Sequence, residues 1–438
     1  MPEHSIEYLP PSAILSRERE WRTHPPEQLK ALRASIQERG VVEPPLIDSM
    51  NRIVCGGLTV EAARAERLNS IPVLRIEHMT DDELRLYAIG AARIAAMSGY
   101  DETVLADEFR ELGKLLGDLD LAAIGMAQAE FDRILALTSR LETDDTFEEG
   151  DPVIPVSRIG DAWLVADSKL FHGDSLEQSS FERLMGEDRA SFILSDVPYN
   201  LSADQISGNG KHQHGNFVQG AGEFTPPEFT RFLTRAMRLM QEFSTDGSLH
   251  AFFMSYHFLL ELMRAGNVVF GRPKAMCTWV KRQGGMGSLF RSQTEFIVYY
   301  KNGKAPHTNN IMLGKHGRNR SSAWFYDGMN SFSDERDELL ALHATPKPVP
   351  LLQDAILDVT RHGEIVLDPF AGSGSIILAA EAAGRRARAI ELDGRYVDGS
   401  IRRVQRVLGA AAIRENDGAS FDDLAAIAAS KAMEAANV

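Results

Sequence analysis

Short apolar runs and stretches with helical spacing alternate along the chain, and their arrangement changes twice. Up to residue 78, strand-like runs at 41–47, 52–55 and 71–76 are separated by helical spacing at 26–39 and 59–68. Residues 80–140 have helical spacing throughout, with Asp81 and Asp101 as expected N-caps. This pattern predicts a small α+β domain followed by a helical connector.

The second half of the chain alternates strands with helices. Strand-like runs stand at 192–194, 249–254, 277–280, 296–300, 365–367 and 388–390, and helical spacing at 227–242, 350–360 and 375–383. Such alternation predicts a doubly wound α/β sheet, mainly parallel, with helices on both faces. The alanine-rich tail from Phe421 is expected to form a surface helix.

A short acidic run marks the boundary between the two halves. Residues 142–151 hold six acids and no base, which is typical of a linker. We therefore expect a first domain at 1–78, a helical connector at 79–141 and a linker at 142–152. The α/β domain then occupies 153–412, and the helical tail 413–438.

Composition excludes several classes of protein. Hydrophobic residues make up 44% of the 438 residues and charged residues 25%, so a packed core is expected. No run approaches the roughly 18 apolar residues that span a bilayer, and the N-terminus has no signal-peptide pattern. Two cysteines predict neither a disulfide framework nor a zinc cluster, and His212 and His214 have no third ligand nearby. We expect a cytoplasmic protein with no membrane partner and no metal.

The charge is distributed unevenly. The whole chain carries −15, but residues 271–320 hold ten bases and one acid, Glu295, a local balance of +9 that leaves −24 elsewhere. Affinity for phosphates depends on local charge, so this basic island fits a nucleic-acid groove. A solvated surface loop would have the same composition.

The segment from Ile365 to Ser375, IVLDPFAGSGS, carries the first candidate chemistry. An apolar strand enters a glycine-bearing turn and then a helix, and ligands of open parallel sheets bind at such turns. Asp368 can order the turn or meet a cationic ligand. Glu391, near the end of the next strand, is placed for a ribose diol. A glycine turn needed only for packing would look similar.

A second strand ends in the polar and aromatic turn Asp196-Val-Pro-Tyr199. Asp196 and the Val197 carbonyl can each accept one hydrogen of an exocyclic amine, which frees the nitrogen lone pair. Pro198 stiffens the turn, and Tyr199 offers a ring face to an unstacked base. Alone, this segment would also fit an ordinary strand and turn.

Together the two segments resemble amino-group DNA methyltransferases of the beta class. The turn at 196–199 is similar to their DPPY tetrad, and 368–374 to their DPFxGSG methyl-donor motif. HATPKP at 343–348, GDSLE at 173–177 and AIELD at 389–393 resemble three further motifs, in the order typical of that class. The tetrad usually has proline where Val197 stands. Because that position supplies a backbone carbonyl, we expect activity to survive.

The resemblance implies a role for each matching residue. Asp196, Pro198 and Tyr199 would hold a flipped base. S-adenosylmethionine would be bound by residues of the donor motifs, namely Asp174, Thr345, Lys347, Asp368, Phe370, Gly372, Gly374 and Glu391. The region at about 271–320 would recognise double-stranded DNA, with Lys281, Arg282 and Arg291 on phosphates or base edges. Trp279, Phe290, Trp324 and Tyr326 are expected in the core, not stacked on bases.

The N-terminal region resembles the ParB/sulfiredoxin-like domain. VCGGLTVEAA at 54–63, followed by the strand IPV at 71–73, is similar to that family's GHxRxxAA stretch and its following VPV strand. Gly57 and Thr59 stand where the family has histidine and arginine. The resemblance therefore implies a scaffold or DNA-docking role without the family's nucleotide or nuclease chemistry.

The favoured interpretation is a site-specific DNA methyltransferase acting on adenine N6, since an Asp-initiated tetrad is commoner for adenine in that family. Cytosine N4 methylation, an RNA substrate, and a ParB-like scaffold with an inactive methylase half are the alternatives. A restriction partner and a homodimer are left open.

Overall fold

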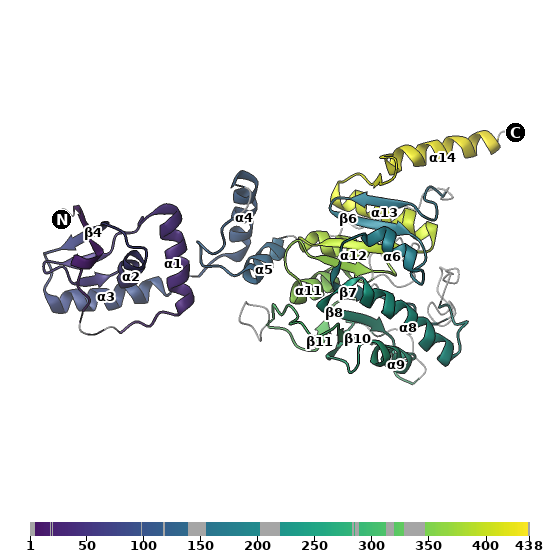
Figure 1. Ribbon diagram of the computed structural model, residues 1–438, viewed down its shortest axis with the longest axis horizontal. Helices are drawn as coiled ribbons and strands as arrows, with labels where there is room; N and C mark the ends of the chain where they lie inside the picture. The colour runs from purple at the N-terminus through teal and green to yellow at the C-terminus, as the bar shows by residue number, and fades with distance from the viewer. Residues whose placement is uncertain are drawn as a thin grey trace. The chain divides into compact units, whose positions relative to one another are not determined.

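The computed structural model describes residues 5–436 except 18, 20, 98, 117–118, 139–154, 202–219, 283, 285–288, 312–318 and 328–346. The chain divides into two compact units, Met1–Thr138 (unit 1) and Ser139–Val438 (unit 2). Each unit is described by itself, and its elements are labelled in Figure 1. The sequence-based boundaries at 78, 141, 152 and 412 stay predictions.

Unit 1 contains a four-stranded sheet in the order β1-β4-β2-β3. Its strands are β1 (Ile6–Leu9), β2 (Leu46–Asp48), β3 (Ile53–Cys55) and β4 (Ile71–Ile76), and only β2 and β4 pair in parallel. Helices α1 (Pro26–Arg39) and α2 (Gly57–Ala65) pack on each other, and Ile47, Val60 and Val73 are fully buried in the core. The α+β arrangement matches the prediction, although β1 was missed.

Three helices complete unit 1, namely α3 (Asp81–Ala95), α4 (Glu102–Leu116) and α5 (Gln128–Thr138). The expected N-cap at Asp81 is wrong. Thr80 caps α3 instead, in a capping box with Glu83, because its hydroxyl reaches the Glu83 amide. Asp101 is confirmed as a cap, since its carboxylate accepts the backbone N–H groups of Thr103 and Val104.

Unit 2 is built on a ten-stranded sheet in the order β11-β9-β10-β8-β7-β12-β13-β6-β5-β14. Its five central strands run parallel, namely β8 (Ser244–Met254), β7 (Ala190–Ser195), β12 (Ile365–Asp368), β13 (Arg386–Glu391) and β6 (Ser168–His172). Antiparallel pairing adds β10 (Thr294–Lys301) and β9 (Ala275–Val280) on one side, and β5 (Ala162–Val165) and β14 (Ile413–Arg414) on the other. Strand β11 (Ala323–Phe325) pairs in parallel with β9.

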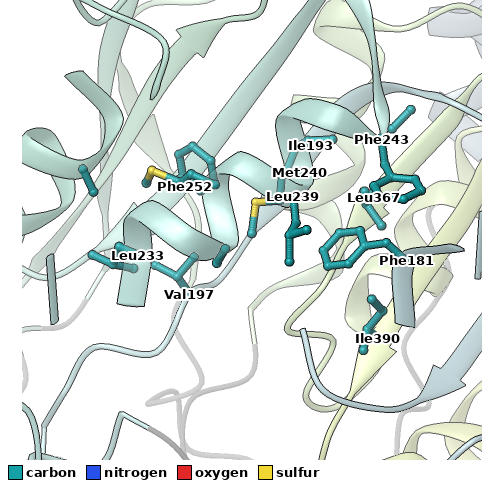
Figure 2. Packing of buried hydrophobic residues seen from close by; sticks show 14 of the residues in the cluster. Phe181, Ile193, Val197, Leu233, Leu239, Met240, Phe243, Phe252, Leu367 and Ile390 are labelled. Atoms are coloured by element: carbon teal, nitrogen blue, oxygen red, sulfur yellow. The ribbon is translucent and has the colours of Figure 1, made fainter. Parts of the chain in front are cut away.

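The helices of unit 2 form a layer on each face of the sheet. Helices α6 (Gln178–Met185), α8 (Pro226–Glu242) and α9 (Leu259–Val269) pack on one face through a large apolar cluster. Figure 2 shows part of this cluster, including Phe181, Leu233 and Phe252. Helices α11 (Val349–Val359), α12 (Ser375–Ala382) and α13 (Gly394–Leu408) contact one another in the second layer. The predicted doubly wound α/β fold is confirmed.

The strand order creates a switch point between β7 and β12. The chain leaves β7 toward β8 on one side and leaves β12 toward β13 on the other, so the loops after β7 and β12 diverge. Ligands of open α/β sheets bind outside the carboxyl ends of the strands at such a point. The two motif segments recognised in the sequence follow these two strands.

Some sequence expectations differ from the structure. Strands β5, β6, β11 and β14 and helices α6, α9 and α13 were not assigned from the sequence. Trp279 and Trp324 are buried as expected and Tyr326 is partly buried, but Phe290 is 82% exposed, so its assignment to the core is wrong. The tail forms α14 (Phe421–Ala436), whose first residue packs edge-on against Trp163.

Candidate active site

The carboxyl ends of β7 and β12 are joined by a side-chain hydrogen bond. The Ser195 hydroxyl donates to Asp368 Oδ1 over 2.8 Å, and both side chains are buried. Because Ser195 immediately precedes Asp196, this bond brings the turn at 196–199 beside the glycine turn that begins at Asp368. The two segments lie 172 positions apart in sequence, counted from Asp196 to Asp368, and are neighbours in the fold.

Asp196 begins the first turn, and its two carboxylate oxygens differ in their contacts with the described residues. Its Oδ2 lies 2.7 Å from Lys347 Nζ, whereas the buried Oδ1 has no hydrogen-bond partner among the described residues. Burial raises the pKa of the Asp196 carboxyl, and the Lys347 ammonium only partly offsets this effect. A buried carboxylate oxygen without a donor is a site where a ligand N–H would be stabilised.

Glu295, at the start of β10, completes this part of the site. Its carboxylate accepts the Tyr199 hydroxyl over 2.8 Å and lies 2.6 Å from Lys281 Nζ and 3.4 Å from Lys347 Nζ. Burial acts to raise the pKa of Glu295, but the two ammonium groups outweigh it and lower the pKa to about 2. Sequence reasoning missed this residue. The available signal was its position as the one acid of the basic island.

Tyr199 is fixed by one contact to its ring and one to its hydroxyl. The Lys347 ammonium lies 5.2 Å from the ring centroid, and the hydroxyl is held by Glu295. Burial and two nearby carboxylates raise the pKa of Tyr199 well above its ordinary value, so the phenol stays protonated. The turn is anchored behind it, because Asn200 exchanges two hydrogen bonds with the Phe224 backbone.

Val197 is 1% exposed and belongs to the apolar cluster under the turn (Figure 2). Its side chain therefore points into the core. Pro198 packs closely on Gly220, where an added Cβ would approach the proline Cβ to 2.5 Å. The position thus requires glycine for the turn to keep its course, the more so because Gly220 has a φ of +70°.

The second turn is ordered by carboxylates that accept backbone N–H groups. Asp368 Oδ1 accepts the Phe370 amide over 3.1 Å, and Glu391 accepts the amides of Gly372 and Asp393 over 2.8 Å each. Gly372 and Gly374 have φ values of +53° and +74°, which favour glycine. Because these glycines have no side chains, a ligand can approach the backbone of the turn closely at the start of α12.

Buried Asp368 and partly buried Glu391 have no cationic partner within 4 Å among the residues that the structure describes. Burial raises the pKa of Asp368 to about 7 and that of Glu391 to about 7. Asp174 follows β6 at the same edge, where its carboxylate accepts the Leu176 amide and the preceding Gly173 amide bonds to the Glu391 carbonyl. This half of the site has the chemistry to receive a cation.

The remaining expected site residues are placed differently. Thr345 lies outside the described residues. Lys347, expected to bind S-adenosylmethionine, has its ammonium on Asp196 and Glu295. Lys281, expected on phosphates, is turned inward onto Glu295 and the Trp279 ring. Arg282 is exposed and pairs with Asp327 over 2.9 Å, and Arg291 is exposed.

Within the described ranges, no group of three His, Cys, Asp or Glu side chains could hold a metal ion. His212 and His214 lie outside these ranges. No helix that the structure describes is both long and apolar enough to cross a bilayer.

Comparisons with known proteins show which families the chain is similar to. Residues 190–402 match the family model N6_N4_Mtase, described as DNA methylase. The Type II methyltransferase M2.DpnII of Streptococcus pneumoniae is 27% identical over 244 residues, which cover 52% of this chain and 86% of that protein.

Two solved structures show likeness at lower identity. PvuII DNA methyltransferase, described as cytosine-N4-specific, has 15% identity and a TM-score of 0.44, covering 60% of this chain and 92% of that one. The C-terminally truncated chromosome-partitioning protein ParB from Caulobacter crescentus, complexed with CTP-gamma-S, has 19% identity and a TM-score of 0.28. That match covers 32% of this chain and 82% of ParB.

Proposed function

We propose that this chain, whose residues 190–402 match a DNA methylase family model, transfers a methyl group from S-adenosylmethionine to an exocyclic amino group of a flipped DNA base. Adenine N6 is the favoured target, because the tetrad begins with Asp196. Cytosine N4 methylation is the alternative.

The unpartnered Oδ1 of Asp196 carries this proposal. It is buried, it lies next to a carboxylate oxygen already neutralised by Lys347, and it stands at the switch point of the sheet. An amine hydrogen is a suitable donor for such an oxygen. The Tyr199 ring, held by Glu295 and Lys347, supplies a face for stacking an extruded base.

The donor half of the site fits S-adenosylmethionine. When bound, this cofactor supplies a methyl group on a positively charged sulfur. The uncompensated carboxylates Asp368 and Glu391 suit a ligand that carries positive charge. Glu391 also keeps lone pairs for ribose hydroxyls, since each oxygen accepts one backbone N–H. Asp174, Phe370, Gly372 and Gly374 would line the rest.

The residues of the acceptor half act on the base amine. Asp196 Oδ1 accepts one N–H, and the Val197 carbonyl accepts the other, so the nitrogen lone pair is withdrawn from the ring and directed out of its plane. Asp196 can then hold the proton that the nitrogen loses, because burial raises its pKa. Positioning supplies most of the acceleration, and no covalent enzyme intermediate is required.

The proposal is tested with labelled S-adenosylmethionine and unmethylated duplex DNA. Wild-type protein incorporates label, and Asp196→Ala loses incorporation while still binding the cofactor by calorimetry. Glu187→Ala is the matched control, because Glu187 is exposed and precedes β7 at its opposite end. Incorporation into RNA only, or none with cofactor bound, would refute DNA methylation. Mass analysis of the nucleosides distinguishes N6-methyladenine from N4-methylcytosine.

Unit 1 is proposed to be a ParB-like docking domain that has lost nucleotide chemistry. Gly56 has a φ of +82° directly before α2, but Gly57 and Thr59 replace the family's polar pair. The full chain should therefore bind no nucleoside triphosphate. Micromolar binding of a labelled triphosphate would contradict this assignment.

A further inference from the structure

The loop between β9 and β10 carries two adjacent, exposed apolar side chains close to the candidate active site. Leu289 is 83% and Phe290 82% exposed, and no large hydrophobic side chain in the described part of the chain is more exposed than Leu289. Single exposed apolar residues are ordinary. Two consecutive ones on a loop, flanked by the exposed arginines Arg282 and Arg291, call for a partner.

The base of this loop is part of the active site. Lys281 and Gln293 exchange two hydrogen bonds across it, each 2.9 Å long. Lys281 Nζ binds Glu295, and Glu295 binds the Tyr199 hydroxyl. The loop therefore rises from the same residues that fix the ring proposed to stack on the flipped base.

The two arms of the loop also approach each other above this base. A Cβ added at Gly284 would lie 2.9 Å from the Arg291 Cβ, so the arms are in close contact at this level. Phe290 immediately precedes Arg291 in sequence and lies one residue further from the loop base. Phe290 lies three positions before Gln293, which limits its distance from the loop base to about 10 Å. It lies five positions before Glu295, which limits that distance to about 17 Å.

We propose that Leu289 and Phe290 form an apolar wedge that enters the duplex beside the extruded base and fills the space it leaves. The inference rests on the proposed function, since it requires a flipped target. Apolar side chains inserted between base steps are a general means of stabilising unstacked DNA. Arg291, next to the wedge in sequence, and Arg282, on the other arm of the loop and paired with Asp327, supply positive charge for the phosphates that such an insertion approaches.

Duplex DNA is favoured over a protein partner by charge. The wedge lies within the basic island at residues 271–320, which has a net charge of +9 in a chain whose net charge is −15. A protein-binding apolar patch would not need arginines on both flanks. The wedge supports extrusion and makes no contact with the reacting atoms, so its effect must depend on whether the target is already unpaired.

The test compares two substrates that differ only in the cost of extrusion. Methylation mapping first identifies a target sequence. Duplexes are then made with the target paired, or with an abasic site opposite it. We expect Phe290→Ala to lower kcat/KM roughly tenfold to a hundredfold on the paired duplex, because unstacking costs a few kcal/mol. On the abasic duplex the loss shrinks to less than about threefold. Leu289→Ala behaves similarly, and Phe290→Trp retains activity.

Matched variants keep the outcomes separate. Val268→Ala removes another apolar side chain, which is 64% exposed near the end of α9, and should leave kcat/KM unchanged on both duplexes. Asp196→Ala should abolish transfer to both duplexes, and if it does not, the proposed function fails instead. 2-Aminopurine at the target position reports extrusion independently of methyl transfer, because its fluorescence rises when the base leaves the stack. This rise on protein binding should be smaller for Phe290→Ala than for the wild type. Equal losses on both duplexes, or no loss with unchanged fluorescence, would overturn the wedge.

Discussion

Replacing Glu295 by glutamine tests whether the acceptor half of the site depends on a buried carboxylate that touches no substrate. Glu295 receives the Tyr199 hydroxyl and two lysine ammonium groups, of Lys281 and Lys347. The amide is nearly isosteric, so the change removes charge and leaves volume. Two ammonium groups would then face one carboxylate, Asp196, in a buried setting.

The stability effect follows from the pKa of Glu295, about 2 against an ordinary 4.5. Each tenfold difference in proton affinity corresponds to about 1.4 kcal/mol, so the ionised carboxylate contributes about 3 kcal/mol. Because the folded-state pKa is depressed, this contribution is present above pH 4.5 and is lost as the pH falls toward 2. At neutral pH, Glu295→Gln should lower the Tm of unit 2 by roughly 5–10 °C.

The activity effect separates positioning from stability. The amide leaves the Tyr199 hydroxyl without a charged acceptor and leaves Lys347 bound to Asp196 alone. Below the melting range, we expect kcat for methyl transfer to fall roughly tenfold or more, with cofactor affinity unchanged. The loss should largely disappear in a Tyr199→Phe background, because that variant already lacks the hydroxyl. Glu295→Asp should restore part of the rate.

Two measurements would contradict this reasoning. A Tm within about 1 °C of wild type would mean that Glu295 carries no stabilising charge. Losses of kcat that add fully in the double variant with Tyr199→Phe would mean that Glu295 acts independently of the Tyr199 hydroxyl. Glu187→Gln, in the turn before β7, is the matched control and should change neither quantity.

Three further predictions concern the cofactor and DNA. Because cation binding requires ionised Asp368 and Glu391, whose pKa values are each about 7, the Kd for S-adenosylmethionine should rise about a hundredfold between pH 8 and pH 6, about tenfold for each carboxylate, measured by calorimetry; a flat profile would exclude these carboxylates. Gly374→Ala should destabilise unit 2 by about 1–3 kcal/mol and weaken cofactor binding, since its φ is +74° and a Cβ would meet Ser400 at 3.0 Å; an unchanged denaturation midpoint would contradict this. Arg282→Ala with Arg291→Ala should flatten the salt dependence of duplex binding, and an unchanged slope of log Kd against log salt would remove their phosphate role.

The parts of the site that follow parallel strands could be predicted from the sequence. Asp196 and Asp368 each end a buried apolar run, and parallel strands deliver their carboxyl ends to one edge. The sequence pattern therefore placed both turns correctly without knowledge of the strand order. Their hydrogen-bonded junction, through Ser195, could not be predicted, because it depends on β7 and β12 being adjacent although β8, β9 and β10 lie between them in sequence.

Glu295 could not be predicted because it is the second residue of an antiparallel strand. Such a strand brings its first residues to the edge where parallel strands end, and nothing in the local pattern of 294–301 signals this reversal. The same reversal explains why Lys281, directly after the neighbouring β9, faces Glu295. A single acid among ten bases was the only trace of this arrangement in the sequence.

The two halves of the site differ in charge, and this difference matches the two groups proposed to meet there. In the acceptor half, the carboxylates of Asp196 and Glu295 are balanced by the ammonium groups of Lys347 and Lys281, so a neutral amine enters without a net change in charge. In the donor half, buried Asp368 and partly buried Glu391 have no cation within 4 Å among the described residues, and their raised pKa values reflect the cost of that isolation. A positively charged ligand relieves this cost only where it binds beside Asp368 and Glu391. The charge distribution therefore assigns donor and acceptor to opposite sides of the Ser195–Asp368 hydrogen bond, independently of any motif.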